Sequence, residues 1–283
     1  MTKYRVNKTK HVDQTKTVSF DFDGKSYHGF EGDTLASALL SNGVHLVGRS
    51  FKYHRPRGIM SCGSEEPNAI CQINEDTDLT EPNVRATEIE LYEGLKASSQ
   101  NCWPSVNFDI GGINNFISPF IPAGFYYKTF MWPKSFWKKI YEPLIRWSAG
   151  LGKSPTKPDP ELYDHKHVHC DVLIIGGGIS GIIASKIAAK NNLKTILIED
   201  KNILGGSTIF QKNENYKIND KYSGEWIDGE IAELKKLDNL TIKTRTSLAA
   251  YHSYNYLLAK ENISDHLPSV SYTHLTLPTK RIV

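Results

Sequence analysis

Residues 171–181 read DVLIIGGGISG, a run of apolar residues that passes directly into closely spaced glycines. The apolar run is continuous, which is typical of a strand buried in a parallel sheet. Gly176, Gly178 and Gly181 take the fixed positions of the pattern G-x-G-x-x-G. In that pattern the first glycine permits a tight turn, the second lets the backbone approach a pyrophosphate, and the third allows close packing of a helix. The stretch therefore predicts a dinucleotide-binding turn between a strand and a helix.

The residues that follow supply the surroundings that this motif requires. A helix is expected over residues 179–190 and a second strand over 194–198, and Glu199 closes that strand. An acidic side chain at this place accepts hydrogen bonds from a ribose diol and disfavours a 2′-phosphate, so NAD or FAD fits better than NADP. Asp200 is the alternative residue for that role.

A glycine pair, Gly205 and Gly206, lies just past the second strand. Flavoproteins often have such a pair near the cofactor, and an ordinary loop explains it equally well. A further helix over 226–237 and a third strand over 240–244 extend the α/β pattern. The sequence predicts the first part of an α/β Rossmann domain, and a domain of this kind that has lost its ligand is the alternative.

The beginning of the chain has a different pattern. Residues 17–30 read TVSFDFDGKSYHGF, which is two strand-like runs around Asp23 and Gly24. An Asp-Gly pair between alternating apolar residues predicts a tight hairpin, because both turn residues need positive φ.

A short helix should follow this hairpin. Asp33 is a suitable N-cap and Gly43 a suitable stop, which leaves a helix of about ten residues between them. Later strands are expected over 70–73 and 88–92. A hairpin followed by a short capped helix is the opening of an α+β domain of the β-grasp type.

Amino-acid composition distinguishes a connector and a linker between these two regions. Residues 101–166 are rich in aromatic residues and proline without a clear period, and are expected to pack on other surfaces. Helix is expected over 135–148, with a break near Pro143, and residues 153–160 should form an extended linker. The expected domains are the β-grasp domain over 1–100, the connector over 101–166 and the first part of the Rossmann domain over 167–268.

The chain has 283 residues and a net charge of +3, with its basic residues spread along its length. This charge is too weak and too dispersed to indicate nucleic-acid binding. No run approaches the roughly 18 apolar residues of a membrane span, and the hydrophilic N-terminus predicts no signal peptide. We expect a cytoplasmic protein whose partners are proteins and small molecules, with no nucleic acid and no membrane among them.

The four cysteines are Cys62, Cys71, Cys102 and Cys170. A plant-type [2Fe–2S] site needs the spacing C-x4-C-x2-C and a distant fourth thiolate, and these cysteines do not provide it. We expect all four to be structural or incidental.

Two histidine-containing segments invite a functional interpretation. In YHRPRG, residues 53–58, no acid or nucleophile pattern accompanies His54, so a loop that holds neighbouring elements is favoured over catalysis. His165, His167 and His169 alternate along an expected strand without a further ligand, which favours a solvated strand over a metal site. The sequence identifies neither a catalytic residue nor a metal ligand.

Six runs of the chain are specific in length and order. They are FKYHRPRGIM (51–60), GSEEPNA (63–69), NCWPSVNFDIG (101–111), PAGFYYKTFMWPKSFW (122–137), AGLGKSPTKPDPELYDHKHVHCDVLIIGGG (149–178) and LGGS (204–207). In this order they resemble the alpha subunits of heterotetrameric sarcosine oxidases, over about residues 15–268.

The resemblance implies an N-terminal domain like a plant-type ferredoxin that has lost its cluster, followed by a Rossmann-type domain that binds NAD. It carries the NAD assignment to Gly176, Gly178, Gly181, Glu199 and Asp200. It further implies FAD in a beta subunit, FMN between alpha and beta, a tetrahydrofolate site in a missing C-terminal part, and beta, gamma and delta subunits as partners. The implied reaction, oxidative demethylation of sarcosine to glycine with folate and O2, takes place at the FAD, so this chain alone should be inactive.

Two alternatives stay open. The alpha subunit of a related amino-acid or opine dehydrogenase would hold FAD or ATP in the same site and would have redox cysteines further along. A non-catalytic scaffold would use the connector to dock partner subunits and would bind no ligand. The missing cluster spacing and the run over 122–137 favour the sarcosine oxidase interpretation.

The last part of the chain does not fit this pattern. Residues 270–279 read VSYTHLTLPT and resemble the translation of a transposase adaptor used for sequencing libraries. Residues 269–283 are therefore expected to be a non-native tail that takes no part in the fold. With three Rossmann strands, the chain made alone should bind NAD poorly and aggregate easily.

Overall fold

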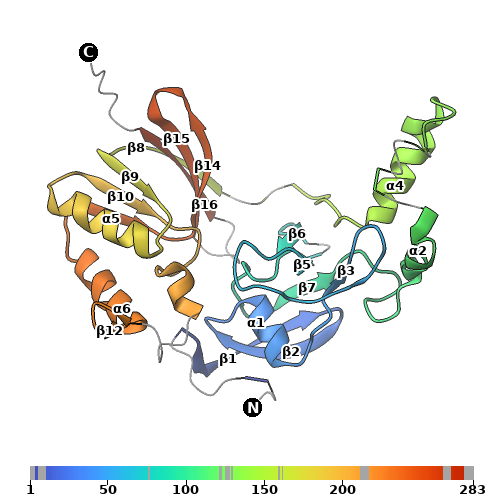
Figure 1. Ribbon diagram of the computed structural model, residues 1–283, viewed down its shortest axis with the longest axis horizontal. Helices are drawn as coiled ribbons and strands as arrows, with labels where there is room; N and C mark the ends of the chain where they lie inside the picture. The colour runs from blue at the N-terminus through green and yellow to red at the C-terminus, as the bar shows by residue number, and fades with distance from the viewer. Residues whose placement is uncertain are drawn as a thin grey trace. The chain divides into compact units, whose positions relative to one another are not determined.

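The computed structural model describes residues 4–5, 11–75, 77–120, 123–124, 128, 130–158, 160, 162–210, 217–263 and 269–276. The chain forms two compact units, Met1–Pro160 and Glu161–Val283 (Figure 1). Residues 277–283 of the predicted tail lie outside the described part of the chain. No helix within that part is long and apolar enough to cross a membrane.

Unit 1 begins with the predicted hairpin. Strand β1 (Asp13–Phe22) pairs antiparallel with β2 (Lys25–Glu31), and the two residues between them have φ of +50° at Asp23 and +73° at Gly24. Both values are positive, as the Asp-Gly signal predicts. Phe20 and Phe22 point to the same side of β1 and are buried in the core, which confirms the expected buried face.

The hairpin extends into a five-stranded mixed sheet. Its order is β2-β1-β7-β5-β6, and β1 and β7 run parallel while the other pairs run antiparallel. The added strands are β5 (Ile70–Ile73), β6 (Glu81–Arg85) and β7 (Leu95–Ser99). A separate two-stranded ladder joins β3 (Gly48–Arg49) to β4 (Pro56–Arg57).

Helix α1 (Leu35–Ser41) is shorter than predicted, and its N-cap is Thr34, not Asp33. The Thr34 and Ser37 side chains cap each other's backbone N–H groups, which forms a capping box. Asp33 instead accepts hydrogen bonds from Arg5 and from the backbone of Phe30. Because Asp33 already has these partners, the residue after it takes the capping position.

The strand predicted over 88–92 is wrong. Ile89 and Leu91 are buried, and the backbone of this segment bonds to the start of α1, through Leu35 N to Ile89 O (2.9 Å) and Leu91 N to Asp33 O (2.9 Å). The alternating pattern thus reflects packing beneath a helix. The sheet takes β7 as its strand instead, a few residues further along.

The connector is helical over its segment 137–149, close to the predicted range 135–148. It contains a π-helical turn η3 (Trp137–Tyr141) and helix α4 (Glu142–Ala149), with Pro143 in the first turn of α4. The expected break is not seen, because the helical run passes directly from π to α geometry at Glu142 and Pro143 lies in the first turn of α4, where its missing N–H is tolerated. Shorter helical segments precede it: η1 (Ile110–Gly112), α2 (Ile113–Phe116) and η2 (Ser118–Phe120).

Unit 2 contains a parallel sheet in the order β13-β10-β9. Its elements lie within a few residues of the predicted ranges: β9 (Val172–Ile175), α5 (Ile179–Lys190), β10 (Thr195–Ile198), α6 (Ser223–Leu234) and β13 (Leu240–Lys243). The central strand β10 is fully buried, whereas β9 is an edge strand and only half-buried, which corrects the prediction of a buried first strand.

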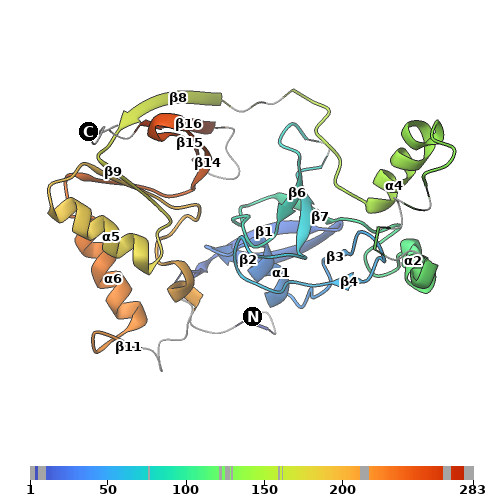
Figure 2. The ribbon, with the colours of Figure 1, turned by 45° about the horizontal axis from the view of Figure 1, so that its top comes forward.

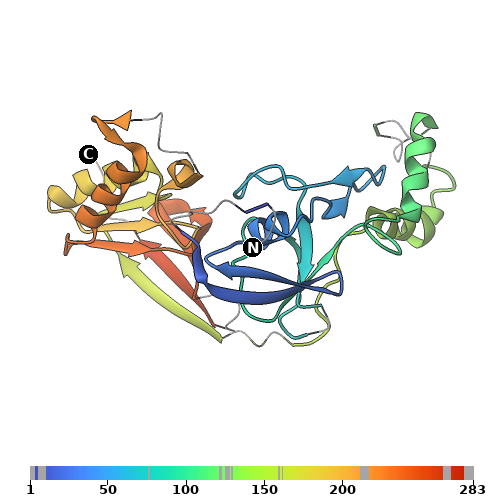
Figure 3. The same cartoon turned by 90° about the horizontal axis from the view of Figure 1, so that it is seen from below.

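The two faces of this sheet are covered differently (Figure 3). Helices α5 and α6 cover one face, where Ile182, Leu197 and Trp226 share a core cluster. The other face packs on β15 (Tyr256–Asn262), where Ile196 and Ile198 contact Leu257 and Ala259. β10 therefore supplies side chains to two cores, which explains its continuous run of apolar residues.

A second sheet has the order β14-β15-β16-β8, with β14 (Thr246–His252), β16 (Ser269–Thr276) and β8 (Leu162–His169). From the sequence, residues 269–283 are expected to take no part in the fold. The structure instead places Ser269–Thr276 as a strand between β15 and β8, with the β8 pairing parallel (Figure 2). β8 is exposed at its histidines, as expected for a solvated strand. Smaller elements of unit 2 are η4 (Gly206–Phe210), β11 (Lys217–Ile218), β12 (Lys221–Tyr222) and η5 (Ser253–Asn255).

Candidate dinucleotide site

The glycine loop between β9 and α5 has the tight geometry that its motif predicts. Gly176 has φ of +97°, and its N–H donates to Ile198 O (2.8 Å), which ties the turn to the neighbouring strand. A Cβ atom added to Gly181 would lie 1.8 Å from Gly176 O. The third glycine is therefore required for the helix to approach the turn from which it starts.

Gly178 occupies the N-cap position of α5 in an extended conformation, and no side chain caps this helix. A Cβ atom added there would meet nothing within 4 Å. The position is thus open, unlike that of Gly181. The backbone N–H groups of a first helical turn have no intrahelical acceptor, and together with the helix dipole they attract anions such as phosphate.

The glycine pair after β10 lies against this loop. Gly205 N donates to Gly177 O (2.8 Å), and a Cβ atom added to Gly206 would lie 2.9 Å from the Cα atom of Gly178. Both glycines have positive φ, +131° and +55°. The pair is therefore part of the same site, and only glycine fits this close approach of two backbone segments.

Glu199 reaches the loop from the end of β10. Its side chain is buried, one carboxylate oxygen accepts a hydrogen bond from Gly177 N, and the other accepts one from Lys201 N (3.1 Å). Asp200, the alternative acidic residue, is exposed. The structure thus brings the glycine loop, the glycine pair and Glu199 together, whereas Asp200 lies exposed beside Glu199.

Burial, together with a hydrogen bond to the Asp200 side chain, raises the pKa of Glu199 to about 7. The two backbone N–H donors act in the opposite direction, because they favour the ionised carboxylate. At this position the effect of desolvation on the pKa is larger than that of the two backbone donors. The carboxylate therefore changes its charge near neutral pH.

Of the histidines singled out in the sequence, His54 has structural partners. His54 Nδ1 lies 2.7 Å from Asp109 Oδ2, and His54 Nε2 lies 3.3 Å from Ser148 O, so this buried ring fastens the connector to the loop over 53–58. Arg55 contributes a further hydrogen bond to Asn115. Within the described residues, no group of three His, Cys, Asp or Glu side chains is arranged to hold a metal ion.

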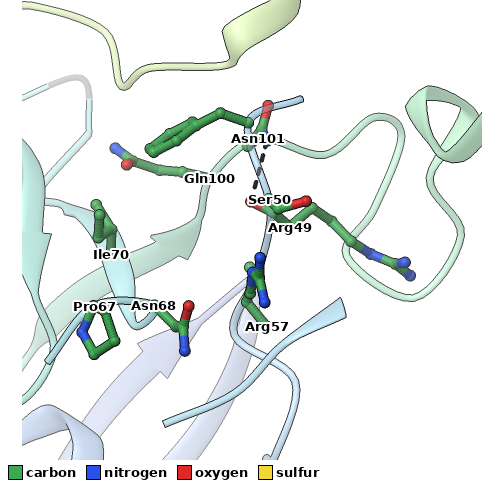
Figure 4. Close-up of a pocket in the computed structure, with 10 residues that line it drawn as sticks. Arg49, Ser50, Arg57, Pro67, Asn68, Ile70, Gln100 and Asn101 are labelled. Carbon is green, nitrogen blue, oxygen red and sulfur yellow. Dashed lines mark hydrogen bonds between the residues drawn. The ribbon is translucent and has the colours of Figure 1, made fainter. Parts of the chain in front are cut away.

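A small cavity in unit 1 was not indicated by any sequence signal (Figure 4). Its polar lining includes Arg57, Asn68 and Gln100. Arg49 also borders it, but its guanidinium points away and donates to the backbone of Val106. The cavity holds no set of side chains with an acid–base or nucleophilic arrangement, so the glycine loop of unit 2 is the better candidate site.

Two family models match the chain. Residues 15–102 match a 2Fe-2S iron-sulfur cluster binding domain, and residues 171–261 match an FAD dependent oxidoreductase. The first range lies in unit 1 and the second in unit 2. The chain therefore combines a ferredoxin-type domain with a flavoprotein-type domain.

Individual proteins that match nearly the whole of this chain extend this result. Sarcosine oxidase subunit alpha of Rhizobium meliloti (strain 1021) is 46% identical over 94% of this chain, and the alignment covers 27% of that protein. The subunit alpha of Corynebacterium sp. (strain P-1) is 29% identical over 92% of this chain and 22% of that protein.

One solved structure shows the same overall fold. L-proline dehydrogenase from P. horikoshii matches 93% of this chain and 40% of its own chain, with a TM-score of 0.55 and 20% identity. The resemblance seen in the sequence is confirmed: the chain is related over nearly all of its length to the alpha subunits of sarcosine oxidase, and it spans about a quarter of the length of these relatives.

Proposed function

We propose that unit 2 is the first part of a Rossmann domain and binds NAD through the loop over 176–181. Gly178 would face the pyrophosphate, and Glu199 would accept hydrogen bonds from the adenosine ribose. Asp200 is the alternative residue for that contact. The remaining site residues would shape the loop around the ligand: Gly176, Gly181, Gly205 and Gly206. NAD supplies hydride-transfer chemistry when it is bound.

The observation that carries this proposal is the convergence of three segments on an open helix start. The loop, the glycine pair and the Glu199 carboxylate meet where α5 begins, and the Cβ position of Gly178 is free. Backbone donors and a ribose acceptor at one place are what a dinucleotide requires. These features favour a ligand-binding loop over a tight turn that has lost its ligand.

For the whole protein we propose the role of a flavin-dependent sarcosine oxidase alpha subunit. This rests on the relatives named sarcosine oxidase subunit alpha and on the FAD dependent oxidoreductase model. The proposal includes FAD and FMN in the assembled enzyme, a tetrahydrofolate site in a part beyond this chain, and beta, gamma and delta subunits as partners. The oxidation would convert sarcosine to glycine, and no residue of this chain is assigned a catalytic role.

A second candidate for the ligand is FAD, because the family model for residues 171–261 describes FAD dependent oxidoreductases. FAD and NAD share the adenosine diphosphate moiety, which is the part that the loop and Glu199 would contact. If the protein is instead the alpha subunit of a related dehydrogenase, this site would likewise have to bind an adenosine phosphate moiety, that of FAD or ATP.

A docking role for the connector is compatible with either ligand. Phe116, Trp132 and Trp147 are 83%, 82% and 77% exposed, which is unusual for large apolar side chains. We propose that partner subunits cover this surface.

The test exploits the open position of Gly178. Gly178→Asp supplies an N-cap side chain to α5 and places a negative charge where the pyrophosphate would lie, so we expect unchanged or higher stability and at least a tenfold loss of NAD binding. Saturation-transfer NMR with NAD, FAD and NADP measures binding even when it is weak. We expect NAD to give larger transfer than NADP.

Either of two outcomes would contradict the site. One is equal NAD binding by Gly178→Asp and the unaltered chain, and the other is equal binding of NAD and NADP. Tighter binding of FAD than of NAD would favour the second candidate ligand.

A further inference from the structure

The ferredoxin-type model that matches residues 15–102 implies a [2Fe–2S] cluster in unit 1. The residues present do not fit one. If Cys62 is the first ligand of C-x4-C-x2-C, the next two ligand positions are Pro67 and Ile70, and if Cys71 is the third ligand, the other two are Gly63 and Asn68. Each alignment provides one thiol where three are needed.

The cysteine environments agree with this mismatch. Cys71 lies fully buried in β5, and burial raises the pKa of its thiol to about 12. Burial also raises the pKa of Cys102. Cluster ligands are thiolates, which these surroundings disfavour.

The same loop is instead organised around a carboxylate. Glu66 is 2% exposed, and its two oxygens accept hydrogen bonds from four backbone N–H groups. Met60 N (2.8 Å) and Ser61 N (2.6 Å) donate to Oε2, and Asn68 N (2.8 Å) and Ala69 N (3.1 Å) donate to Oε1. The donors come from both sides of Glu66 in the sequence, so the loop closes around its own side chain.

Strand β6 and the turn that follows it hold this loop in place. Thr87 Oγ1 donates to Gly63 O (2.8 Å), and Arg85 Nε donates to Glu66 O (3.1 Å). The carboxylate is therefore part of the ordered interior of unit 1. None of the four residues whose backbone donates to it is a cysteine.

Converging backbone N–H groups form an anion-binding concavity, and many Fe–S sites are built in this way. We propose that the Glu66 carboxylate is the anion that this loop holds in place of an iron–sulfur cluster. Unit 1 then folds without metal and transfers no electrons, so any electron entering or leaving the flavoprotein-type unit takes another route. This inference concerns unit 1 alone and is independent of NAD binding by unit 2.

The first experiment asks whether the loop accepts a cluster. The complete chain is incubated anaerobically with ferrous iron and sulfide, desalted and assayed for iron, for acid-labile sulfide and for an EPR signal after reduction. We expect no stoichiometric iron and no signal. A bound, EPR-active cluster in the unaltered chain would overturn the proposal.

The second experiment removes the charge. Glu66→Gln places an amide NH2 group against two of the four backbone donors, so we expect hydrogen exchange in the peptide over 60–69 to become at least tenfold faster. Glu65→Gln is the matched control, because it makes the same change at the adjacent exposed residue and should exchange like the unaltered chain. Equal exchange in both variants would remove Glu66 from its proposed role.

A third variant remains informative if Glu66→Gln does not fold. Glu66→Ala leaves space for a small anion where the carboxylate lies. We expect sodium formate to raise its denaturation midpoint more than sodium chloride does at the same ionic strength. An equal effect of the two salts would contradict an anion-holding loop.

Discussion

The two units of this chain each contain a loop in which backbone N–H groups converge on a buried glutamate, with opposite results. Glu66 in unit 1 has four backbone donors, and Glu199 in unit 2 has two. Burial raises the pKa of a carboxyl group in both places. Four donors outweigh burial, so the pKa of Glu66 is lowered, whereas the pKa of Glu199 rises to about 7.

The difference shows that the number of backbone N–H donors decides whether a buried carboxylate serves only the structure of its loop or can still bind a ligand. A carboxylate that uses all its lone-pair directions on its own loop stays ionised and has no capacity for a ligand. A carboxylate with two donors keeps acceptor capacity. The N-termini of the helices differ in the same way. Side chains of Thr34 and Ser37 satisfy backbone N–H groups of α1, whereas Gly178 has no side chain to cap α5.

The largest expected effect concerns the backbone of the unit 2 loop. Gly181→Ala places a Cβ atom 1.8 Å from Gly176 O, which the backbone can relieve only by moving α5 away from the turn. We expect unit 2 to lose about 3 kcal/mol of unfolding free energy or more. Urea unfolding followed by hydrogen exchange of β10 amides measures this loss.

Gly229→Ala is the matched control for that substitution. Gly229 is exposed in α6 and a Cβ atom there would meet nothing within 4 Å, so alanine should stabilise the helix by about 0.5–1 kcal/mol. Similar changes in unfolding free energy for Gly181→Ala and Gly229→Ala would show that α5 is not tightly packed against the glycine loop.

The next effect is the pH dependence that the two glutamates impose. Between pH 4.5, the ordinary pKa of a glutamate, and about 7, folded unit 2 binds more protons at Glu199 than the unfolded chain does. Its unfolding free energy therefore falls as pH rises through this window, by at most about 3 kcal/mol. Glu199→Gln should remove this slope, which urea titrations at several pH values can measure.

Glu66 should have the opposite sign. Because its pKa is lowered on folding, its contribution to stability is present above the unfolded pKa and is lost as pH falls through the folded pKa. Titrations of Glu66→Gln should therefore differ from the unaltered chain at neutral pH and converge with it in acid. A Glu199→Gln variant that keeps the slope above pH 4.5 would refute the comparison.

The smallest effect concerns the two helix starts. Thr34→Ala removes one side of the capping box and should cost unit 1 about 1 kcal/mol. Thermal unfolding followed by circular dichroism can detect this change. No measurable loss would mean that α1, like α5, does not depend on a side-chain cap.

Much of the local structure could be predicted because short segments specify it. The Asp23–Gly24 turn has the positive φ values that its residues allow, and α5 begins and ends where the pattern after the glycine motif places it. The strand over 88–92 could not be predicted correctly, because burial of Ile89 and Leu91 under a helix produces the same alternation as a sheet. Glu66 had no local signal at all, since its donors are identified only once the loop is closed.

The sequence by itself determined the glycine motif, the acidic residue that follows it and the order of the parallel α/β elements, because these depend on spacing and periodicity within short stretches. Only the tertiary structure decided that Gly206 lies against Gly178, that β16 pairs with β8, and that Glu66 has four donors while Glu199 has two. The physical reason is that burial and the number of hydrogen-bond partners depend on contacts between segments, and these set the charge of a buried carboxylate.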